Sequence, residues 1–103
     1  MALVPYTTPT HKFTLPIALS NLAAIKITYE QNGSRILVKT LDDCTLSGKV
    51  LSFKLTQQET GKFESNKAVK IQLHGLLKSG DAFQTNTKTV RVEDVLDREV
   101  IEA

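Results

Sequence analysis

The chain has only one cysteine and no tryptophan among its 103 residues. The single thiol, that of Cys44, excludes a disulfide within the chain. The carboxylates of Asp42 and Asp43 precede this cysteine and would raise the pKa of its thiol, so a nucleophilic role is disfavoured. We expect Cys44 to be a small, half-buried apolar side chain at the start of a strand.

A large excess of charge of one sign is also missing. The chain has 13 Lys and Arg residues and 11 acidic residues, so its formal net charge is +2. So small an excess does not indicate nucleic acid as a partner. The chain has only six aromatic residues, and Phe13, Phe53 and Phe63 are expected in the core, so few remain to stack on bases. A solvated lysine face that protects sheet edges is therefore favoured over a nucleic-acid site. The lysines that could gather on one sheet are Lys39, Lys49, Lys54, Lys67, Lys70 and Lys88.

Long apolar runs are missing as well. No stretch approaches the ~20 apolar residues of a membrane-spanning helix, and the start of the chain has neither a charged leader nor a long apolar run. The sequence therefore predicts no signal peptide, no transmembrane segment and a cytoplasmic location at synthesis. A length of 103 residues with 41% hydrophobic content suits one domain with one core.

The clearest pattern that is present lies in residues 50–77, which predict a strand, a short helical corner and a second strand. Apolar residues alternate with polar ones on both sides of the corner, which is the period of a strand with one buried face. The two strands must therefore bury one shared apolar face. Its residues are Leu51, Phe53 and Leu55 before the corner and Val69, Ile71 and Leu73 after it.

The corner itself, near residues 56–62, has the signature of a single helical turn. Thr56 and Glu59 form a capping-box pair, in which the Thr hydroxyl accepts the amide at the third helical position and the Glu carboxylate accepts the cap amide. We expect Gly61 to end the turn in the left-handed region, and Phe63 to fold back onto the core. A connection of this kind joins the two sheets of an immunoglobulin-type sandwich.

Further strands and hairpins are predicted on both sides of this unit. The segment 35–41 is more apolar than strict alternation requires, which predicts a central strand covered partly on both faces. The expected elements are a short edge strand at 11–15, a tight connection or one helical turn at 18–24, strands at 25–30 and 35–41 joined by an Asn32-Gly33 hairpin, a turn with a short strand inside it at 42–49, and a second hairpin turn at 78–81.

The last long strand, residues 82–92, has apolar residues on both of its faces. Either a bulge near Lys88 switches the faces or the first half of the strand lies beyond the core. The conflicting residues are Phe83, Thr85, Thr87 and Thr89 on one face and Val90 and Val92 on the other. After this strand, a final packing anchor is predicted, with a short amphipathic helix as the alternative. It would consist of Val95, Leu96, Val100 and Ile101.

Together these elements predict an all-β protein, an immunoglobulin-like two-sheet β-sandwich of about seven strands with one short helical turn near residues 56–62. A small, partly open barrel is the alternative. Residues 1–9 contain Pro5 and Pro9 and lack the donors for a regular ladder. We predict that they form an extended N-terminal arm, which either lies along the domain or reaches a neighbour, and that residues 10–103 form a single β-sandwich domain.

No catalytic or metal-binding constellation stands out. His11 and His74 lie far apart in the sequence and lack nearby Cys, His or carboxylate partners, so both are expected as polar residues on outer strand faces. Asp42 and Asp43 would point to opposite sides of a strand, which favours a turn over a paired acid and base. Glu59 has a structural role as a capping partner. The sequence therefore predicts no enzyme, no metal site, no cofactor and no small-molecule substrate.

Interaction with protein is the remaining class. The arm could add as a strand to the edge of a neighbour's sheet, or the threonine-rich strand could pair edge to edge with another copy. The alternative is a monomer with a frayed arm. The predicted interaction surface consists of Pro5, Tyr6, Pro9, Thr85, Thr87 and Thr89.

Five stretches carry a resemblance over nearly the whole chain: PYTTPTHKFTLPI at 5–17, ITYEQNG at 27–33, LTQQETGKF at 55–63, the KIQLHGLLKSGDAF hairpin and the closing VEDVLDREVI. Together they resemble a family of small, mostly uncharacterised proteins encoded in phages and prophages of Gram-positive gut bacteria. More loosely, the strand order is similar to the immunoglobulin-like domain at the start of phage baseplate upper proteins. The resemblance implies a virion or tail-associated structural module that binds other virion proteins or itself, located in the virion or the host-cell cytoplasm.

Two other functions stay open at this point. The chain could be a module that meets a host target, either a surface glycan or a bacterial protein that it inhibits. An exposed cluster drawn from Tyr6, Tyr29 and Phe83 would favour glycan. A nucleic-acid accessory factor is the third possibility, and its affinity would fall steeply with salt.

Overall fold

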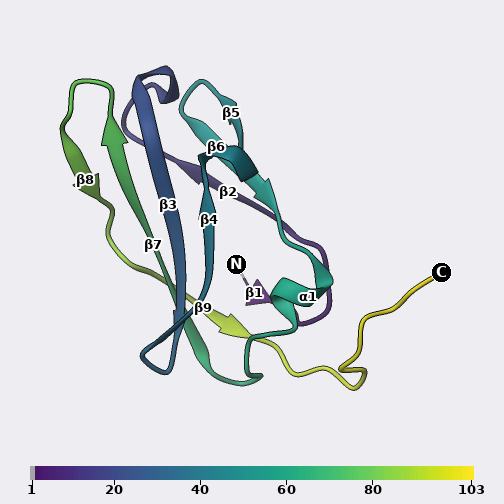
Figure 1. Ribbon diagram of the computed structural model, residues 1–103. Helices are drawn as coiled ribbons and strands as arrows, with labels where there is room; N and C mark the ends of the chain where they lie inside the picture. Colours follow the sequence, from purple (N-terminus) through teal and green to yellow (C-terminus); the bar gives the residue numbers. More distant parts are fainter. Residues whose placement is uncertain (1) are drawn as a thin grey trace.

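The alternating strands of this chain give two apolar sheet faces, and the protein buries them against each other (Figure 1). The structure, a computed structural model, describes residues 2–103. One sheet has the order β1-β9-β7-β3-β4 with β8 also paired to β7, and the other has the order β2-β6-β5. The strands are β1 (Ala2–Leu3), β2 (Thr10–Thr14), β3 (Leu22–Gln31), β4 (Ser34–Thr40), β5 (Thr45–Ser47), β6 (Val50–Lys54), β7 (Ala68–Leu77), β8 (Ala82–Gln84) and β9 (Lys88–Val92).

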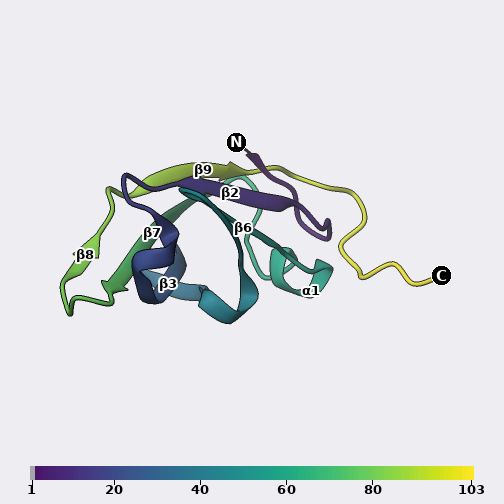
Figure 2. The ribbon, with the colours of Figure 1, turned by 90° about the horizontal axis from the view of Figure 1, so that it is seen from above.

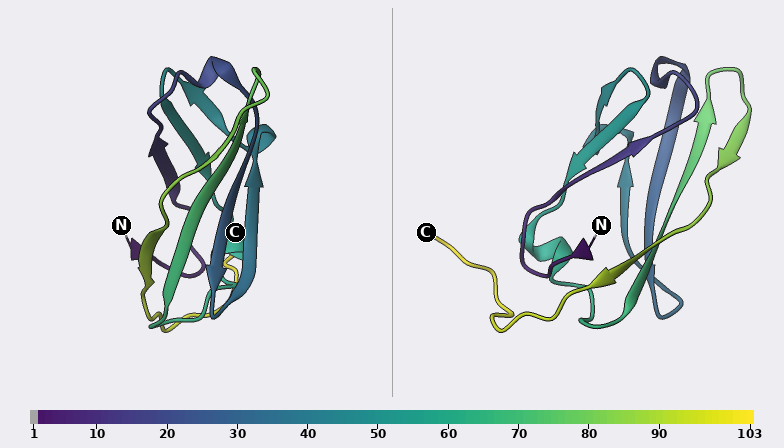
Figure 3. Two further views of the ribbon diagram at one scale, coloured as in Figure 1. Left: turned by 90° about the vertical axis from the view of Figure 1, so that its left-hand side faces the viewer. Right: turned by 180° about the vertical axis from the view of Figure 1, so that it is seen from behind.

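The strand order has the connectivity of an immunoglobulin-type sandwich. Strands β2, β6 and β5 take the places of B, E and D, and strands β3, β7 and β9 take those of C, F and G. The chain crosses from β6 to β7, and so from one sheet to the other, over the helical turn α1 (Gln57–Thr60). The prediction of an all-β, two-sheet sandwich is confirmed, and the two layers are seen side by side in Figure 3.

The core between the sheets combines many aliphatic side chains with a group of packed aromatic rings. Tyr29 packs edge-on against Phe53 and tilted against Phe63, with ring centroids 6.4 and 5.9 Å apart. Offset and edge-on pairs of this kind add to the stabilisation from buried area. The buried hydrophobic residues of the core are Leu3, Leu15, Leu19, Leu22, Ile25, Ile27, Tyr29, Leu37, Leu51, Phe53, Leu55, Phe63, Val69, Ile71, Leu73, Val90 and Val92.

The capped corner forms as the sequence predicts, with one exception. The amide of Glu59 donates to the Thr56 hydroxyl at 3.1 Å, and the amide of Thr56 donates to the Glu59 carboxylate at 2.9 Å. The expected left-handed Gly61 is wrong, because its φ is −67°. Glycine is needed there for a different reason: a Cβ atom on Gly61 would lie 2.5 Å from the ring of Tyr6.

The N-terminal arm lies along its own domain, which is the first of the two expected placements. Its residues Ala2–Leu3 form a short parallel pairing with Arg91 and Val92 of β9, so the expectation of no ladder is wrong at this point. Leu3 is fully buried. Farther along, the Thr7 amide donates to the Thr60 hydroxyl at 3.1 Å, and that hydroxyl donates to the Thr7 carbonyl at 2.9 Å. Residue 1 of the predicted arm lies outside the described residues.

The first hairpin forms as predicted, but its second strand does not have the predicted position in the sheet. Asn32 and Gly33 both have positive φ, 55° and 78°, as a two-residue type I′ hairpin requires. Strand β4 is at the edge of the six-stranded sheet and not in its centre, so that prediction is wrong. Ile36 and Val38 on its outer face are only half-buried, and its inner face carries a lysine.

Two 3-10 turns and two further hairpins, β5–β6 and β7–β8, make other connections. The turn η1 (Leu19–Asn21) confirms the expected helical connection, and η2 (Leu41–Asp43) with β5 confirms the turn and short strand after β4. The second hairpin turn, between β7 and β8, is closed by the Gly80 amide donating to the Leu77 carbonyl at 2.9 Å.

The last strand is interrupted and not bulged. Strands β8 and β9 both pair with β7, and residues 85–87 lie between them without strand structure. Thr85 bridges the gap, because its hydroxyl accepts the Leu73 amide at 3.1 Å and its own amide donates to the Leu73 carbonyl at 2.9 Å. The break lets Phe83 and Val90 both face inward. Phe83 lies over Gly75, where a Cβ atom would be 2.4 Å from its ring.

The closing residues leave the sheets and form neither a strand nor a helix (Figure 3). Val95 and Val100 are half-buried, but Leu96 and Ile101 have exposed fractions of 104% and 72%. The predicted packing anchor is therefore wrong for two of its four residues, and the alternative helix is absent from this segment. Among residues 2–103 no helix has the length and apolar character to cross a bilayer.

Candidate functional site

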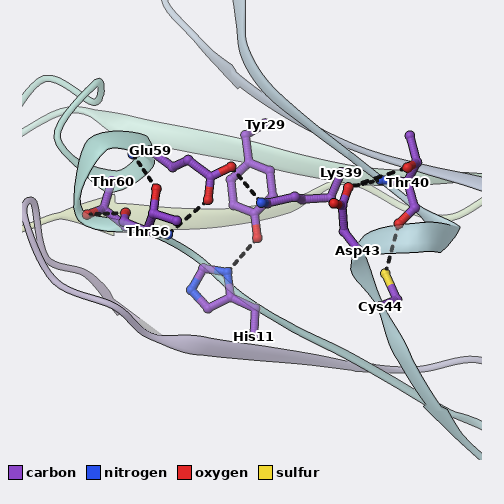
Figure 4. Close-up of polar contacts among 9 residues, drawn as sticks. All are labelled: His11, Tyr29, Lys39, Thr40, Asp43, Cys44, Thr56, Glu59 and Thr60. Atoms are coloured by element: carbon purple, nitrogen blue, oxygen red, sulfur yellow. Dashed lines mark hydrogen bonds and ion pairs between the residues drawn. The ribbon is translucent and has the colours of Figure 1, made fainter.

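Four polar side chains meet between the two sheets, next to the edge strand β4 (Figure 4). They are His11 from β2, Tyr29 from β3, Lys39 from β4 and Glu59 from α1. His11, Tyr29 and Lys39 are buried. The outer-face position expected for His11 is wrong, because the residue shares the inward face of β2 with Phe13. His74 is on the exposed face of β7, as expected.

The two rings of this cluster contact each other directly. His11 Nδ1 and Tyr29 Oη are 2.5 Å apart, and the rings stack with centroids 5.8 Å apart. Burial, and then the charge of Lys88, lowers the pKa of His11. Burial, and then the charge of Glu59, raises the pKa of Tyr29. The imidazole is therefore neutral and the phenol protonated at pH 7, which suits a structural hydrogen bond better than proton transfer.

An ion pair ties the edge strand β4 to the corner. Lys39 Nζ lies 2.5 Å from Glu59 Oε2, while Glu59 Oε1 accepts the Thr56 amide. Burial alone would raise the pKa of Glu59, but its bonds to Lys39 and Thr56 outweigh this and hold the pKa below its ordinary value. An inward-pointing lysine also protects an exposed edge from pairing with another sheet. One carboxylate thus caps α1 and anchors β4.

Cys44 lies at the far end of β4, just before β5. Its Sγ donates to the Thr40 carbonyl at 3.2 Å. Burial, and then the charge of Asp43, raises its pKa to about 11, so the thiol is protonated at pH 7. The expected half-buried position of Cys44 at the start of a strand is confirmed. A second capping box, not predicted from the sequence, precedes Cys44: Asp43 Oδ2 accepts the Thr40 amide at 2.9 Å.

The geometry of the cluster suits structure better than chemistry. Each member has a bonding partner within the cluster or on the adjoining backbone, although His11 Nε2 has none among the described residues. Five surface hollows in residues 2–103 are lined by other side chains. Within the same residues, no three His, Cys, Asp or Glu side chains are placed to hold a metal ion.

The six residues of the predicted interaction surface do not form one patch. Pro5 is buried, and Pro9 is half-buried with its carbonyl accepting the Leu55 amide at 2.9 Å. Tyr6 is half-buried in the hollow beside residues 61–67, of about 510 Å³. Thr85 is half-buried and bonded to β7. Thr87 and Thr89 are exposed, but each lines a different hollow.

The aromatic residues that would favour glycan are not clustered either. Tyr29 is fully buried in the core. Tyr6 lies against Gly61 and Phe83 against Gly75, at two separate places on the molecule. The lysines are dispersed in the same way: Lys39 is inside the sandwich, whereas Lys54 and Lys70 lie on the outer faces of different sheets.

Each free strand edge has a feature that hinders pairing with another chain. β4 carries the inward Lys39 and a register shift beside Tyr29, and β5 is only three residues long. β2 lies between Pro9 and Pro16, which cannot donate to a ladder. On the side of the larger sheet away from β4, the edge strand β1 is only two residues long, and residues 85–87 separate β8 from β9. Because such features are ways of blocking edge pairing, side-chain surfaces are the better candidates for contact with a partner.

The fold and the cluster therefore define a β-sandwich domain of immunoglobulin connectivity, whose interior polar groups hold its sheets and its corner together. No protein-family model matches the chain, and neither a curated protein nor a solved structure is significantly similar to it.

Proposed function

We propose that the chain is a non-enzymatic protein–protein interaction module of a phage or prophage particle, associated with the virion or its tail. The observation that supports an interaction module is that the interior polar side chains bind one another, which leaves the surface for binding a partner. Lys39 and Glu59 neutralise each other, and His11 and Tyr29 bond to each other with their pKa values moved away from neutrality. Groups used in this way stabilise a scaffold, and binding is left to the surface.

The shape of the domain favours the same function. Its principal extents are 47 × 32 × 18 Å, so the molecule is flattened along one axis. A thin domain of 11.4 kDa offers more area for contact per residue than a globule of the same mass. The assignment to a phage particle is supported by the sequence resemblance alone.

The test is to locate the protein in induced cultures of a lysogen whose prophage encodes it. Particles are purified through a density gradient and probed with an antibody against the chain. We expect the protein in the particle band, at a constant ratio to a major structural protein. Finding the chain only in the free protein of the lysate, and never in the particles, would overturn the proposal.

A further inference from the structure

The charge of this protein is divided unevenly along the chain. Residues 93–103, which we call the acidic segment, contain five of the 11 acidic residues and one of the 13 Lys and Arg residues. The segment therefore has a formal charge of −4, which leaves +6 for residues 1–92 within the overall +2. Opposite charges on two parts of one chain favour contact between the segment of one copy and the body of another.

The acidic segment also carries uncovered apolar side chains. Leu96 and Ile101 are the most exposed large apolar residues of the part of the chain that the structure describes. The backbone of the segment is nevertheless held in place. The Gln57 side chain donates to the Ile101 carbonyl at 3.1 Å and accepts the Ile101 amide at 2.8 Å. The segment is thus tied to its own domain at Ile101, while the Leu96 side chain remains exposed and available to a partner.

A complementary surface lies on the outer face of the six-stranded sheet. There Leu76, with an exposed fraction of 41%, borders a mostly apolar hollow of about 250 Å³. Lys26 and His74 lie at its rim and supply a positive charge and an N–H donor. The hollow has room for an aliphatic side chain, and its rim suits the carboxylates that flank Leu96. Its lining residues are Ala24, Ile25, Lys26, His74, Gly75, Leu76 and Ala82.

The hollow and the acidic segment lie at opposite ends of the molecule, as Figure 2 shows by the positions of β8 and the C-terminus. An extended chain of eleven residues reaches at most about 40 Å, and Ile101 is tied to α1 at the near end. The segment therefore cannot fill the hollow of its own copy. A contact between different patches on two copies is heterologous, so it can repeat from copy to copy.

We propose that copies of this chain associate head to tail, with Leu96 of the acidic segment docked in the Leu76 hollow of the next copy and its carboxylates beside Lys26. The inference rests on the proposed function, since it names the partner of the module as a second copy of the chain. Bringing one leucine into an apolar site favours association about tenfold or more, and the opposite charges add to it at low salt.

The test uses the full chain and three substitutions at exposed leucines, with mass measured by sedimentation velocity over a range of concentrations. Leu96→Ser removes the docking side chain, and Leu76→Ser removes the wall of the hollow. Leu46→Ser is the matched control, because Leu46 is 40% exposed on β5, away from both surfaces. We expect the parent and the control to exceed 11.4 kDa as concentration rises. Each of the other variants should associate at least about tenfold more weakly.

Mixing the two weakened variants tests the head-to-tail arrangement itself. The Leu96→Ser copy keeps its hollow, and the Leu76→Ser copy keeps its docking leucine. An equal mixture should therefore form a dimer and stop there, at concentrations where each variant alone is still a monomer. A mixture that stays monomeric, or that grows beyond a dimer, would overturn the head-to-tail contact.

The charges are tested with a swap. Lys26→Glu should weaken association, and Asp97→Lys combined with Lys26→Glu should restore part of it, with both effects shrinking at high salt. A parent protein that is monomeric at every concentration would overturn this inference. If that monomer were still found in purified particles, the proposed function would stand. If the protein associated but were found only outside particles, the proposed function would fail and this inference would stand.

Discussion

The corner at residues 55–63 and the acidic segment at residues 93–103 contain similar kinds of residues, but their apolar side chains have opposite environments. Both combine acidic and apolar residues with side-chain bonds to the backbone. In the corner, Leu55 and Phe63 are buried, whereas in the acidic segment Leu96 is exposed. The corner has the strands β6 and β7 on its two sides, and Lys39 of β4 pairs with its Glu59. The segment is attached to its domain at one side only. Local bonds can thus shape a turn, but burial needs a surface that comes from elsewhere in the fold.

The largest difference between the two regions should come from truncating one apolar side chain in each. Phe63→Ala removes a buried ring and should lower the free energy of unfolding by about 3–5 kcal/mol. Leu96→Ala should change it by no more than about 0.5 kcal/mol, because the side chain is already in water. Urea denaturation of dilute protein measures both. Equal losses would show that the segment is packed in solution.

A smaller difference is expected between the ion pair of the corner and an exposed ion pair. Lys39→Ala should cost about 1–3 kcal/mol, because it leaves the Glu59 carboxylate without its partner at a largely buried position. Lys67→Ala, which breaks the pair with Glu64, should cost less than about 0.5 kcal/mol. Side-chain exposure is 11% and 18% in the first pair and 52% and 58% in the second. The denaturation midpoints of the two variants measure this difference. A loss of stability in Lys67→Ala as large as that in Lys39→Ala would contradict the prediction.

The loss of one local side-chain bond in each region should give a smaller difference again in the free energy of unfolding. Thr56→Ala removes the cap of α1 and should cost about 1 kcal/mol. Asp94→Ala breaks the exposed pair with Arg98 and should cost at most about 0.5 kcal/mol. Thermal unfolding followed by circular dichroism compares the two. A neutral Thr56→Ala would mean that the cap adds nothing to a corner already fixed by its strands.

The smallest expected effect is on how the free energy of unfolding changes with pH. The pKa of Glu59 is below its ordinary value of 4.5 in the folded protein, so the unfolded chain binds a proton first as pH falls. The stabilisation is present in full above about pH 4.5 and is lost as pH falls through the folded pKa. Glu59→Gln should flatten this acid limb in urea titrations at several pH values. Glu64→Gln should flatten it less, because the Glu64 carboxylate is exposed and its charge is screened by solvent.

The parts of the fold that depend on neighbouring residues were predictable from sequence. Thr56 with Glu59 and Asn32 with Gly33 act over a few residues, and both form the turns that their chemistry favours. The alternation of Val69, Ile71 and Leu73 likewise predicted the inward face of β7. These signals were sufficient for the two-sheet architecture.

The parts that depend on distant residues were not predictable. The burial of Lys39 requires Glu59 to lie opposite, and nothing in the local pattern of β4 shows that carboxylate. His11 is polar and so was expected outside, but Tyr29 provides the hydrogen bond that lets it lie inside. The glycine at position 61 was expected to serve a positive φ. The structure shows another reason for it, because the Tyr6 ring of the arm lies where a side chain on residue 61 would be.

The contact between Phe83 and Gly75 has a consequence for how the sequence of this domain can diverge. The ring occupies the space that a side chain on residue 75 would need, so the two positions share one volume. A relative with alanine or a larger residue at position 75 should carry a residue smaller than phenylalanine at position 83. Replacements at these two sites are therefore expected to occur together.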